Sequence, residues 1–461
     1  MFFCMFTALQ NVMRRFLSTF LPQFLKPTLK IKDPVMTVTT PQNETIDSTS
    51  NPQATSQNET VNNETVNNKT LDNESFDLSN IDIAVATDTS QLPQPVQPPL
   101  KRANYKTYAT DFIVNEILPL AFTDEGEHLW LHIQKSGMNT AYLATLLSEW
   151  AEIPLRDVGY SGLKDRHAVT TQWFSLRIPK KQLPTTEFAP VDIGDNESVT
   201  ILAQHWHNKK LNRGTHKVNE FIITLRNIEF ESLDNETSEQ VPIAKQRIEQ
   251  HLKTLSENGV PNYFGPQRFG RNGNNVREAL ALFARPLREA RPQPKKSKRK
   301  RAPREQNTME LSAARSLIFN EILAARVNDG SWNHGLDGDV FNLDGSGSIF
   351  TSETMDDTLQ ARLASGDIHP TGVLWGTGND KVSANAATIE YDTVQNNPLL
   401  TQLAKGLETR DIKAQRRALR LPIEALSWKW ENDQTLVLSF TLTTGSFATS
   451  VLAGLVQQLE S

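Results

Sequence analysis

One stretch constrains the local fold of the chain more than any other: residues 159–178, GYSGLKDRHAVTTQWFSLRI. From Val169 onward apolar side chains recur at every second position, as Phe174, Leu176 and Ile178. A period of two predicts a strand with one buried face. The preceding residues, 162–167, then form a short loop at a strand end, where a rigid scaffold can present side chains to a ligand.

Asp165 lies in this loop between cationic neighbours. Lys164 and Arg166 flank it, and His167 can also carry a charge. We expect whichever of these faces Asp165 to favour the ionised carboxylate, and an ionised, positioned carboxylate can act as a nucleophile. The same residues also suit a charged turn on the surface with no catalytic role.

The letters around Asp165 resemble a known family. GYSGLKDRHAVTTQW, residues 159–173, is similar to the signature of the tRNA pseudouridine synthase D family, with Ser161 and Arg166 as small departures that remove no reacting group. Other matching stretches occur along the chain in the family's order: DFIVNE at 111–116, GEHL at 126–129, NEF at 219–221, GVPNYFGPQRFG at 259–270, LSAARS at 311–316 and GSFATS at 445–450. The resemblance extends from about Lys101 to the C-terminus.

The resemblance implies a role for seven residues of this sequence. The family's nucleophilic aspartate corresponds to Asp165. Positions associated with the substrate uridine correspond to Phe112, Asn219, Phe221 and Phe447, and supporting positions to Glu116 and Lys164. Stacking on an aromatic ring is worth roughly 1 to 3 kcal/mol per base. Without the resemblance, a phenylalanine on a strand is ordinarily part of the core, and an asparagine before a strand ordinarily caps a turn.

The implied chemistry needs few groups. Conversion of uridine to pseudouridine breaks the bond between base and ribose, turns the base and rejoins it through carbon, so it needs no cofactor. We expect tRNA as the partner and no membrane. We also expect no metal, because His205, His207 and His216 lack a carboxylate or thiolate to complete a zinc site. Which carbon Asp165 attacks stays open. The alternatives are a tRNA-binding or folding protein without chemistry and an Asp165/His167 hydrolase, for which no third residue is found.

The first hundred residues differ in composition from the rest. Residues 41–99 are rich in Asn, Gln, Ser, Thr and Pro, so they cannot bury enough apolar surface to offset chain entropy. We expect residues 1–100 to be a disordered extension. Arg14 and Arg15 interrupt the apolar start, which rules out a membrane span there and leaves a transit peptide, an interfacial helix or a misassigned start codon. The single cysteine, Cys4, suits a reducing compartment, and we expect a cytoplasmic monomer.

The folded part is predicted to be α+β. We expect a pseudouridine-synthase-like catalytic domain with a mixed sheet, formed by residues 101–258 and 422–461, and an inserted α/β domain at 259–421, the last inferred from the resemblance. Alternation predicts strands at 108–117, 129–133, 221–226, 425–430 and 435–442, and helical spacing predicts helices that include 139–150, 243–258, 275–284, 312–327 and 398–419. A closing helix from Thr449 is expected to carry Val456.

Two basic segments are candidate contacts to an RNA backbone. Residues 205–217 hold four Lys or Arg and no acid, and residues 294–304, PKKSKRKRAPR, are denser still. Residues 33–100 carry ten Asp or Glu against one Lys, so most of the net negative charge falls there. The chain from residue 101 onward is close to neutral, and any basic surface must be local. Either segment could equally be a solvated face.

Overall fold

The computed structural model describes residues 81–188, 194, 197–231, 240–286 and 309–460. The polar tract up to residue 80 and the basic segment 294–304 lie outside the described residues. The folded chain begins earlier than Lys101, with α2 (Ile83–Ala86) and the short helix η1 (Thr89–Gln91). Ile83 is buried, and the Tyr263 hydroxyl donates a hydrogen bond of 3.0 Å to the carbonyl of Pro93. Residues 81–100 are therefore packed against the fold.

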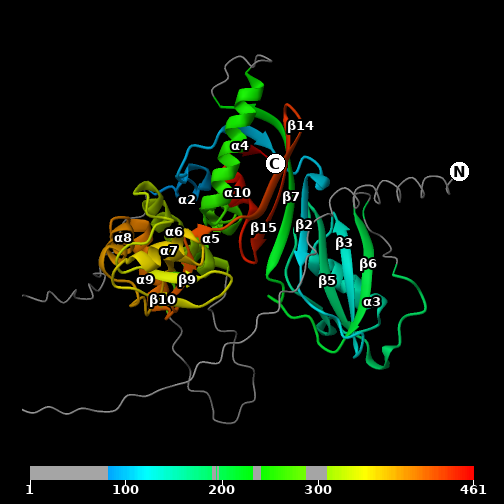
Figure 1. Ribbon diagram of the computed structural model, residues 1–461. Coiled ribbons are helices and arrows are strands. Elements are labelled where there is room, and N and C mark those ends of the chain that lie inside the picture. Colours follow the sequence, from blue (N-terminus) through cyan, green and yellow to red (C-terminus); the bar gives the residue numbers. More distant parts are fainter. Residues whose placement is uncertain (1–80, 189–193, 195–196, 232–239, 287–308, 461) are drawn as a thin grey trace, which may run out of the picture. The chain divides into compact units, whose positions relative to one another are not determined.

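A ten-stranded mixed sheet forms the larger part of the molecule (Figure 1). Its strand order is β14-β15-β7-β2-β5-β3-β6, with β1 beside β7 and β16, and β4 beside β5. The strands are β1 (Leu100–Asn104), β2 (Phe112–Ile117), β3 (His128–Ser136), β4 (Val158–Tyr160), β5 (Val169–Arg177), β6 (Ser198–His207), β7 (Val218–Phe230), β14 (Glu424–Asn432), β15 (Thr435–Thr443) and β16 (Val456–Glu460).

Two pairs in this sheet are parallel and bring together distant parts of the chain. Strand β2 runs parallel to β5, and β1 runs parallel to β16, which is the last strand of the chain. Strand β7 lies at the centre because it pairs antiparallel with β2 on one side and with β15 on the other. The sheet is therefore complete only when the C-terminal strands have returned to it.

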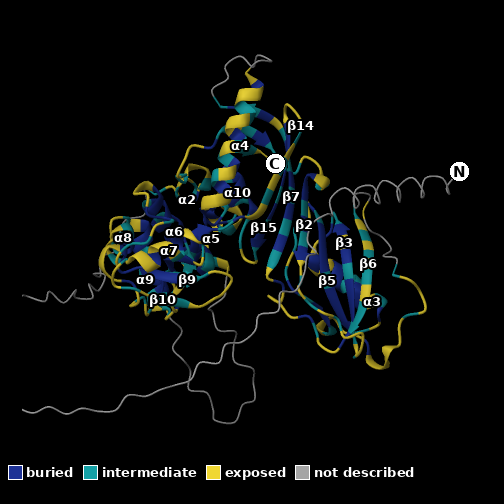
Figure 2. Ribbon diagram, viewed as in Figure 1, coloured by how far each residue is buried: buried dark blue, intermediate teal, exposed yellow. Residues whose placement is uncertain are grey.

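Helices cover the sheet through apolar contacts. Helix α3 (Thr140–Trp150) begins after Asn139, whose side chain accepts from the amide of Tyr142 as a helix N-cap, and packs on β3 and β5. Helices α4 (Val241–Asn258) and α10 (Ala448–Ala453) share a second core with β2, β7 and β15. Figure 2 shows buried and exposed residues alternating along α4, as expected for a helix with one apolar side.

The chain between β8 (Val260–Pro261) and β13 (Arg420–Leu421) packs apart from the larger sheet. Its antiparallel sheet has the order β10 (Ile349–Thr351), β9 (Val340–Leu343), β11 (Ile368–Leu374), β12 (Gln415–Ala418). Its helices are α5 (Asn274–Phe283), α6 (Met309–Asn328), α7 (Asp357–Ala364), α8 (Ala384–Gln395) and α9 (Pro398–Thr409). Strands β8 and β13 pair antiparallel, so the segment leaves and rejoins the larger sheet at one place.

Short 3-10 turns occur in both parts of the chain. They are η2 (Ala109–Asp111), η3 (Leu155–Asp157), η4 (Pro179–Lys181), η5 (Pro266–Arg268) and η6 (Arg271–Gly273).

Several predicted elements need correction. The helix predicted at 398–419 ends at Thr409, and residues 415–418 form β12 instead. The closing helix ends at Ala453, and Val456 begins β16. The strand predicted from Tyr108 begins at Phe112, after η2. In the described part of the chain, every helix is too short or too polar to cross a membrane.

Candidate active site

Asp165 lies in the loop that joins β4 to β5, as the sequence predicts. Its carboxylate makes two contacts. One oxygen, Oδ2, is 2.5 Å from the Nζ atom of Lys106, and the other, Oδ1, accepts from the backbone amide of His167 at 3.0 Å. The carboxylate side chain is 33% exposed. It is therefore held in place and still accessible.

The surroundings of Asp165 favour its ionised form. Burial alone opposes ionisation, but the hydrogen bond and the charge of Lys106, with the amide of His167, outweigh it and hold the pKa of Asp165 below its usual value. The carboxylate is thus ionised at neutral pH, which is the state that a nucleophile requires.

The cation that pairs with Asp165 is not one of its neighbours in sequence. Lys106 comes from the loop between β1 and β2 and has a φ angle of 59°, a conformation that is uncommon outside glycine. Lys164 turns away to Asn219, and Arg166 donates to the carbonyl of Gly137 at 2.6 Å. Of the three neighbours expected to favour the ionised carboxylate, His167 contacts it through its backbone amide, whereas Lys164 and Arg166 face elsewhere.

Three buried side chains hold the backbone of the Asp165 loop. The amide of Gln172 donates to the carbonyl of Gly162 at 3.2 Å, and the hydroxyl of Thr140 accepts from the backbone amide of Lys164 at 2.9 Å. The Nζ atom of Lys135 donates to the carbonyl of Asp165 at 3.1 Å. The Thr140 hydroxyl also donates to Gln172 at 2.9 Å, so two of the three supports are joined.

Lys135 is fully buried and lies under the Asp165 loop. Its Nζ atom also donates to the carbonyl of Met138 at 2.6 Å. Burial lowers the pKa of Lys135 to about 8, partly opposed by the charge of Asp165. A cation at this position adds to the positive potential around Asp165.

A second buried group lies beside the loop and centres on Lys164. Its Nζ atom donates to the side-chain oxygen of Asn219 at 2.5 Å and lies 3.5 Å from the Glu116 carboxylate. Glu116 and Asn219 are paired residues on β2 and β7. Burial raises the pKa of Glu116, although Lys164 opposes this, and burial lowers the pKa of Lys164. The structure therefore brings together three of the predicted residues.

A neutral histidine closes this group from the other side. Burial, and secondarily the charge of Lys164, lower the pKa of His216 to about 4, so its contact of 3.6 Å with Glu116 is not an ion pair at neutral pH. The hydroxyl of Ser161 accepts from the backbone amide of His216 at 2.8 Å. A Cβ atom on Gly162 would lie 2.9 Å from the His216 ring, which explains why a glycine occupies this turn.

The two phenylalanines on β2 and β7 are in contact. The rings of Phe112 and Phe221 have centroids 6.2 Å apart in an edge-to-face arrangement, and Phe221 also stacks on Phe440 at 5.6 Å. The Nζ atom of Lys106 lies 4.4 Å above the Phe112 ring. Both side chains are buried, so in this arrangement they belong to the core as well as to the surroundings of Asp165.

Phe447 lies with a different set of residues. Its ring contacts Phe264 of the inserted segment, with centroids 6.3 Å apart. Its loop nevertheless begins beside Asn219, because Leu442 pairs with Asn219 in the sheet and the backbone amide of Thr444 donates to the carbonyl of Lys217 at 2.8 Å. The structure thus places the Phe447 loop at the Asn219 end of the sheet without a ring contact to Phe112 or Phe221 among the described residues.

Four polar residues of the site were missed by sequence reasoning: Lys106, Lys135, Thr140 and Gln172. Lys106 sits in a polar stretch, and no local pattern distinguishes it. Lys135 offered a signal, because it continues the alternation of Leu131 and Ile133 and so falls on the predicted buried face of their strand. Gln172 offered a weak signal, because an uncharged polar residue within a predicted buried strand must find hydrogen-bond partners.

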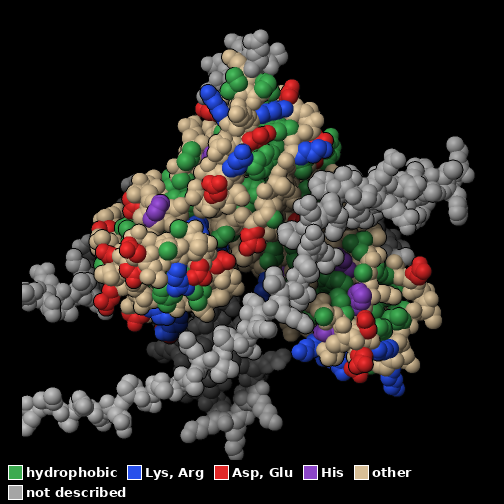
Figure 3. All heavy atoms as spheres, in the orientation of Figure 1, with side chains coloured by type: hydrophobic (Ala, Val, Ile, Leu, Met, Phe, Trp, Pro, Cys, Tyr) green, Lys and Arg blue, Asp and Glu red, His purple; other side chains and the backbone are tan. Residues whose placement is uncertain are grey.

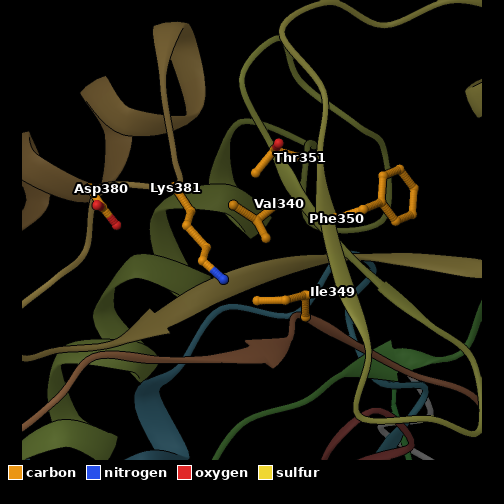
Figure 4. A pocket seen from close by; sticks show the side chains of 6 residues that line it. All are labelled: Val340, Ile349, Phe350, Thr351, Asp380 and Lys381. Atoms are coloured by element: carbon orange, nitrogen blue, oxygen red, sulfur yellow. The ribbon is translucent and has the colours of Figure 1, made fainter.

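Other candidate sites do not join this one. His205, from the basic segment 205–217, stacks on Phe122 with centroids 4.4 Å apart, and the described residues hold no cluster of three potential metal ligands. A cavity of about 460 Å³ in the inserted segment (Figure 4) is formed by other side chains: Val340, Ile349, Phe350, Thr351, Asp380 and Lys381. None of the predicted site residues lines it.

Comparisons with known proteins agree with this arrangement. The model of the family tRNA pseudouridine synthase D (TruD) matches residues 102–290 and 276–455. The chain is 76% identical to the tRNA pseudouridine synthase D of Psychrobacter arcticus over 82% of this chain and 96% of that protein. It is 41% identical to that of Xanthomonas euvesicatoria pv. vesicatoria over 79% of this chain and 94% of that protein.

A solved structure supports the fold. The candidate tRNA pseudouridine synthase D of Methanosarcina mazei superposes with a TM-score of 0.57 at 21% identity, covering 78% of this chain and 95% of that chain. With the mixed sheet, the inserted segment and the sequence relatives taken together, the chain belongs to the tRNA pseudouridine synthase D family.

Proposed function

We propose that this protein isomerises uridine to pseudouridine in tRNA, at position 13, with Asp165 as the nucleophile. The observation that carries the proposal is the state of the Asp165 carboxylate. Lys106 favours its ionised form, and the backbone amide of His167 in the same loop holds it in place. Family membership supplies the reaction and the class of substrate. We assign the activity to a cytoplasmic monomer as part of the same proposal.

The proposed chemistry uses groups that are already beside Asp165. The carboxylate forms a covalent bond to the nucleotide, the bond between nitrogen one of the base and ribose breaks, and the base rejoins ribose through carbon five. The proton on carbon five leaves to a base or to solvent, nitrogen one takes up a proton, and the carboxylate is released. The base must first leave its stack to reach the loop. Asn219 is positioned by Lys164, so its amide group has a fixed orientation for a hydrogen bond to the uracil edge.

The aromatic part of the proposal involves three rings. Phe112 lies under Lys106, next to the nucleophile, and Phe221 supports it from β7. Phe447 is the least buried of the three phenylalanines and lies on a loop that starts beside Asn219. We assign Phe447 to stack on the flipped uracil, and Phe112 and Phe221 to form the apolar wall behind it.

Glu116 and Lys164 have a supporting role in this scheme. Because Glu116 is buried and accepts no hydrogen bond from a described residue, its charge acts mainly on Lys164. Lys164 in turn fixes Asn219. A change at Glu116 therefore affects the uracil site indirectly.

The test is the substitution Asp165→Asn. The asparagine has the same shape and can still accept from His167, so the protein should fold and bind tRNA with an affinity close to that of the native protein. Release of tritium from tRNA labelled at carbon five of uracil should fall to background. Asp157→Asn, at the end of η3, is the matched control and should retain full turnover. Normal turnover by Asp165→Asn would reject the mechanism.

A further inference from the structure

Two arginines of the inserted segment lie over one aromatic ring, and a third binds the strand that carries one of them. The Cζ atom of Arg417, on β12, lies 4.3 Å from the centre of the Phe264 ring, and that of Arg268, in η5, lies 5.2 Å from it. Arg315, on α6, donates to the side chain of Gln415 at 3.2 Å, two residues before Arg417 on the same strand face. We call Arg268, Arg315 and Arg417 the arginine cluster.

The arginine cluster is not neutralised by the described part of the protein. None of its three guanidinium groups has a carboxylate of a described residue within 4.0 Å. Two other arginines of the same segment are paired with carboxylates: Arg326 lies 2.9 Å from Asp339, and Arg416 lies 2.8 Å from Glu390. Since Arg416 and Arg417 are adjacent on β12, the difference is between the two faces of one strand.

The cluster also holds donors without acceptors. The Nε atoms of Arg268 and Arg315 are buried and make no hydrogen bond with a described residue. Arg417 uses one edge of its guanidinium on Asn262, with a bond of 2.5 Å to its side-chain oxygen. Burial, followed by the charge of Arg268, lowers the pKa of Arg417 to about 10. Arg417 therefore stays charged at neutral pH although the charge of Arg268 repels it, and an anion would relieve that repulsion.

The position of the cluster connects it to the candidate active site. Phe264, which lies against both Arg268 and Arg417, contacts Phe447, and the hydroxyl of Ser450 in the following helix donates to the carbonyl of Tyr263 at 3.0 Å. All three arginines are residues of intermediate exposure, neither fully buried nor fully exposed. A chain of nucleotides that placed a uridine against Phe447 would therefore pass its backbone close to these guanidinium groups.

We propose that Arg268, Arg315 and Arg417 bind a phosphodiester group of the RNA substrate next to the target uridine. Guanidinium groups suit this role because their planar donor edges match phosphate oxygens and keep their charge. This inference rests on the proposed function, because it takes the RNA from it. It adds a site in the inserted segment. Figure 3 shows Lys and Arg interspersed with Asp and Glu on the face drawn.

The experiment compares the binding of an unmodified tRNA transcript by four proteins: the native chain, Arg268→Gln, Arg417→Gln and Arg362→Gln. Arg362 is the matched control, since its guanidinium also lies over a phenylalanine, Phe350, at 5.3 Å but is paired with Asp367 at 2.6 Å. Fluorescence anisotropy at several KCl concentrations gives Kd and its salt dependence, and single-turnover tritium release at saturating tRNA gives the rate of the chemical step.

Arg268→Gln and Arg417→Gln should each raise Kd roughly tenfold and reduce the slope of log Kd against log salt by about 1. The single-turnover rate at saturating tRNA should stay within about twofold, and Arg362→Gln should match the native protein. If both variants keep the native Kd and salt slope, the phosphate site is rejected.

Two further results keep the inference testable. Arg417 also packs on Phe319, with 5.7 Å between its Cζ atom and the ring centre, so a folding defect in Arg417→Gln would leave Arg268→Gln as the deciding variant. Absence of pseudouridine with the native protein would reject the proposed function, whereas the binding comparison would still decide the arginine cluster.

Discussion

At the scale of single residues, the site depends on a cation that reaches the nucleophile from another part of the chain. Lys106 pairs with Asp165 at 2.5 Å, although 59 positions separate them in sequence. The adjacent cations Lys164 and Arg166 are used elsewhere. The loop sequence predicted an ionised carboxylate correctly, but not the cation that pairs with it, because a side chain's direction from a tight turn is set by backbone geometry that residue types alone do not specify.

Lys106→Met tests the ionisation of Asp165. Without the lysine, burial is the main influence left on the carboxylate, so the pKa of Asp165 should rise. A smaller fraction is then ionised at any acidic pH, and the acidic limb of the kcat profile should move to higher pH. The loss of kcat should be larger at pH 5 than at pH 8. The measurement is single-turnover tritium release from pH 4.5 to 9.

The matched control for this prediction is Lys101→Met, which removes an exposed lysine from β1. Its pH profile should coincide with that of the native protein. A profile of Lys106→Met that keeps the native acidic limb and is only scaled down would contradict the assigned role of Lys106.

At the scale of structural elements, the loop that carries Asp165 is fixed through its backbone. Lys135 on β3, Thr140 at the start of α3 and Gln172 on β5 each bind a different peptide group of residues 162–165. The three supporting side chains come from the sheet and from the helix that covers it, so regular secondary structure holds the loop in one conformation. A positioned nucleophile of this kind reduces the ordering needed to reach the transition state.

Thr140→Val removes one of these supports with little change in shape. The backbone amide of Lys164 and the side-chain oxygen of Gln172 would both lose a buried partner, which costs about 1 to 3 kcal/mol of unfolding free energy. Because the loop loosens, kcat should fall while the Kd for tRNA stays near the native value. Urea denaturation and single-turnover kinetics measure the two effects.

Thr145→Val, one turn further along α3, is the comparison for this change. Its hydroxyl makes only a bond of 3.3 Å to the carbonyl of Ala141 on the exposed side of the helix. It should leave both quantities within error of the native protein. Equal effects of the two substitutions would mean that Thr140 serves the stability of the helix and not the loop.

Local elements were predictable where the pattern depends on the segment itself. The strand β5 and the helices α3 and α4 were predicted from the sequence close to their observed bounds. The errors fall where a distant partner decides. Residues 415–418 are favourable for a helix but pair with β11, and Val456 leaves helical spacing to pair with Leu100 on β1.

At the scale of the whole molecule, the sheet is assembled from two separated parts of the chain. Strand β7 precedes the inserted segment and β15 follows it, yet the two strands pair along eight residues. The resemblance to the family predicted this return, and composition did not. The boundaries predicted at 259 and 421 remain a proposal, which the pairing of β8 with β13 supports.

The pairing of β8 with β13 makes the independence of the two parts testable. Pro261 and Arg420 are paired across this short ladder, so a variant that begins at Pro93 and joins these residues through a short Gly-Ser linker keeps every strand of the larger sheet. The core shared by β2, β7, β15, α4 and α10 stays intact, and we expect cooperative thermal unfolding. Tm should be lower, because Phe447 and Ser450 lose their contacts with Phe264 and Tyr263.

This variant should also separate the two RNA-binding contributions. It keeps the pair of Lys106 with Asp165 but lacks the arginine cluster. Its Kd for tRNA should therefore be higher than that of Arg268→Gln or Arg417→Gln, and its slope of log Kd against log salt should be shallower. Circular dichroism melts and anisotropy titrations are the measurements, with a chain that begins at Ile81 and keeps the segment as the control. A melt without a cooperative transition would show that the sheet needs the inserted segment in order to fold.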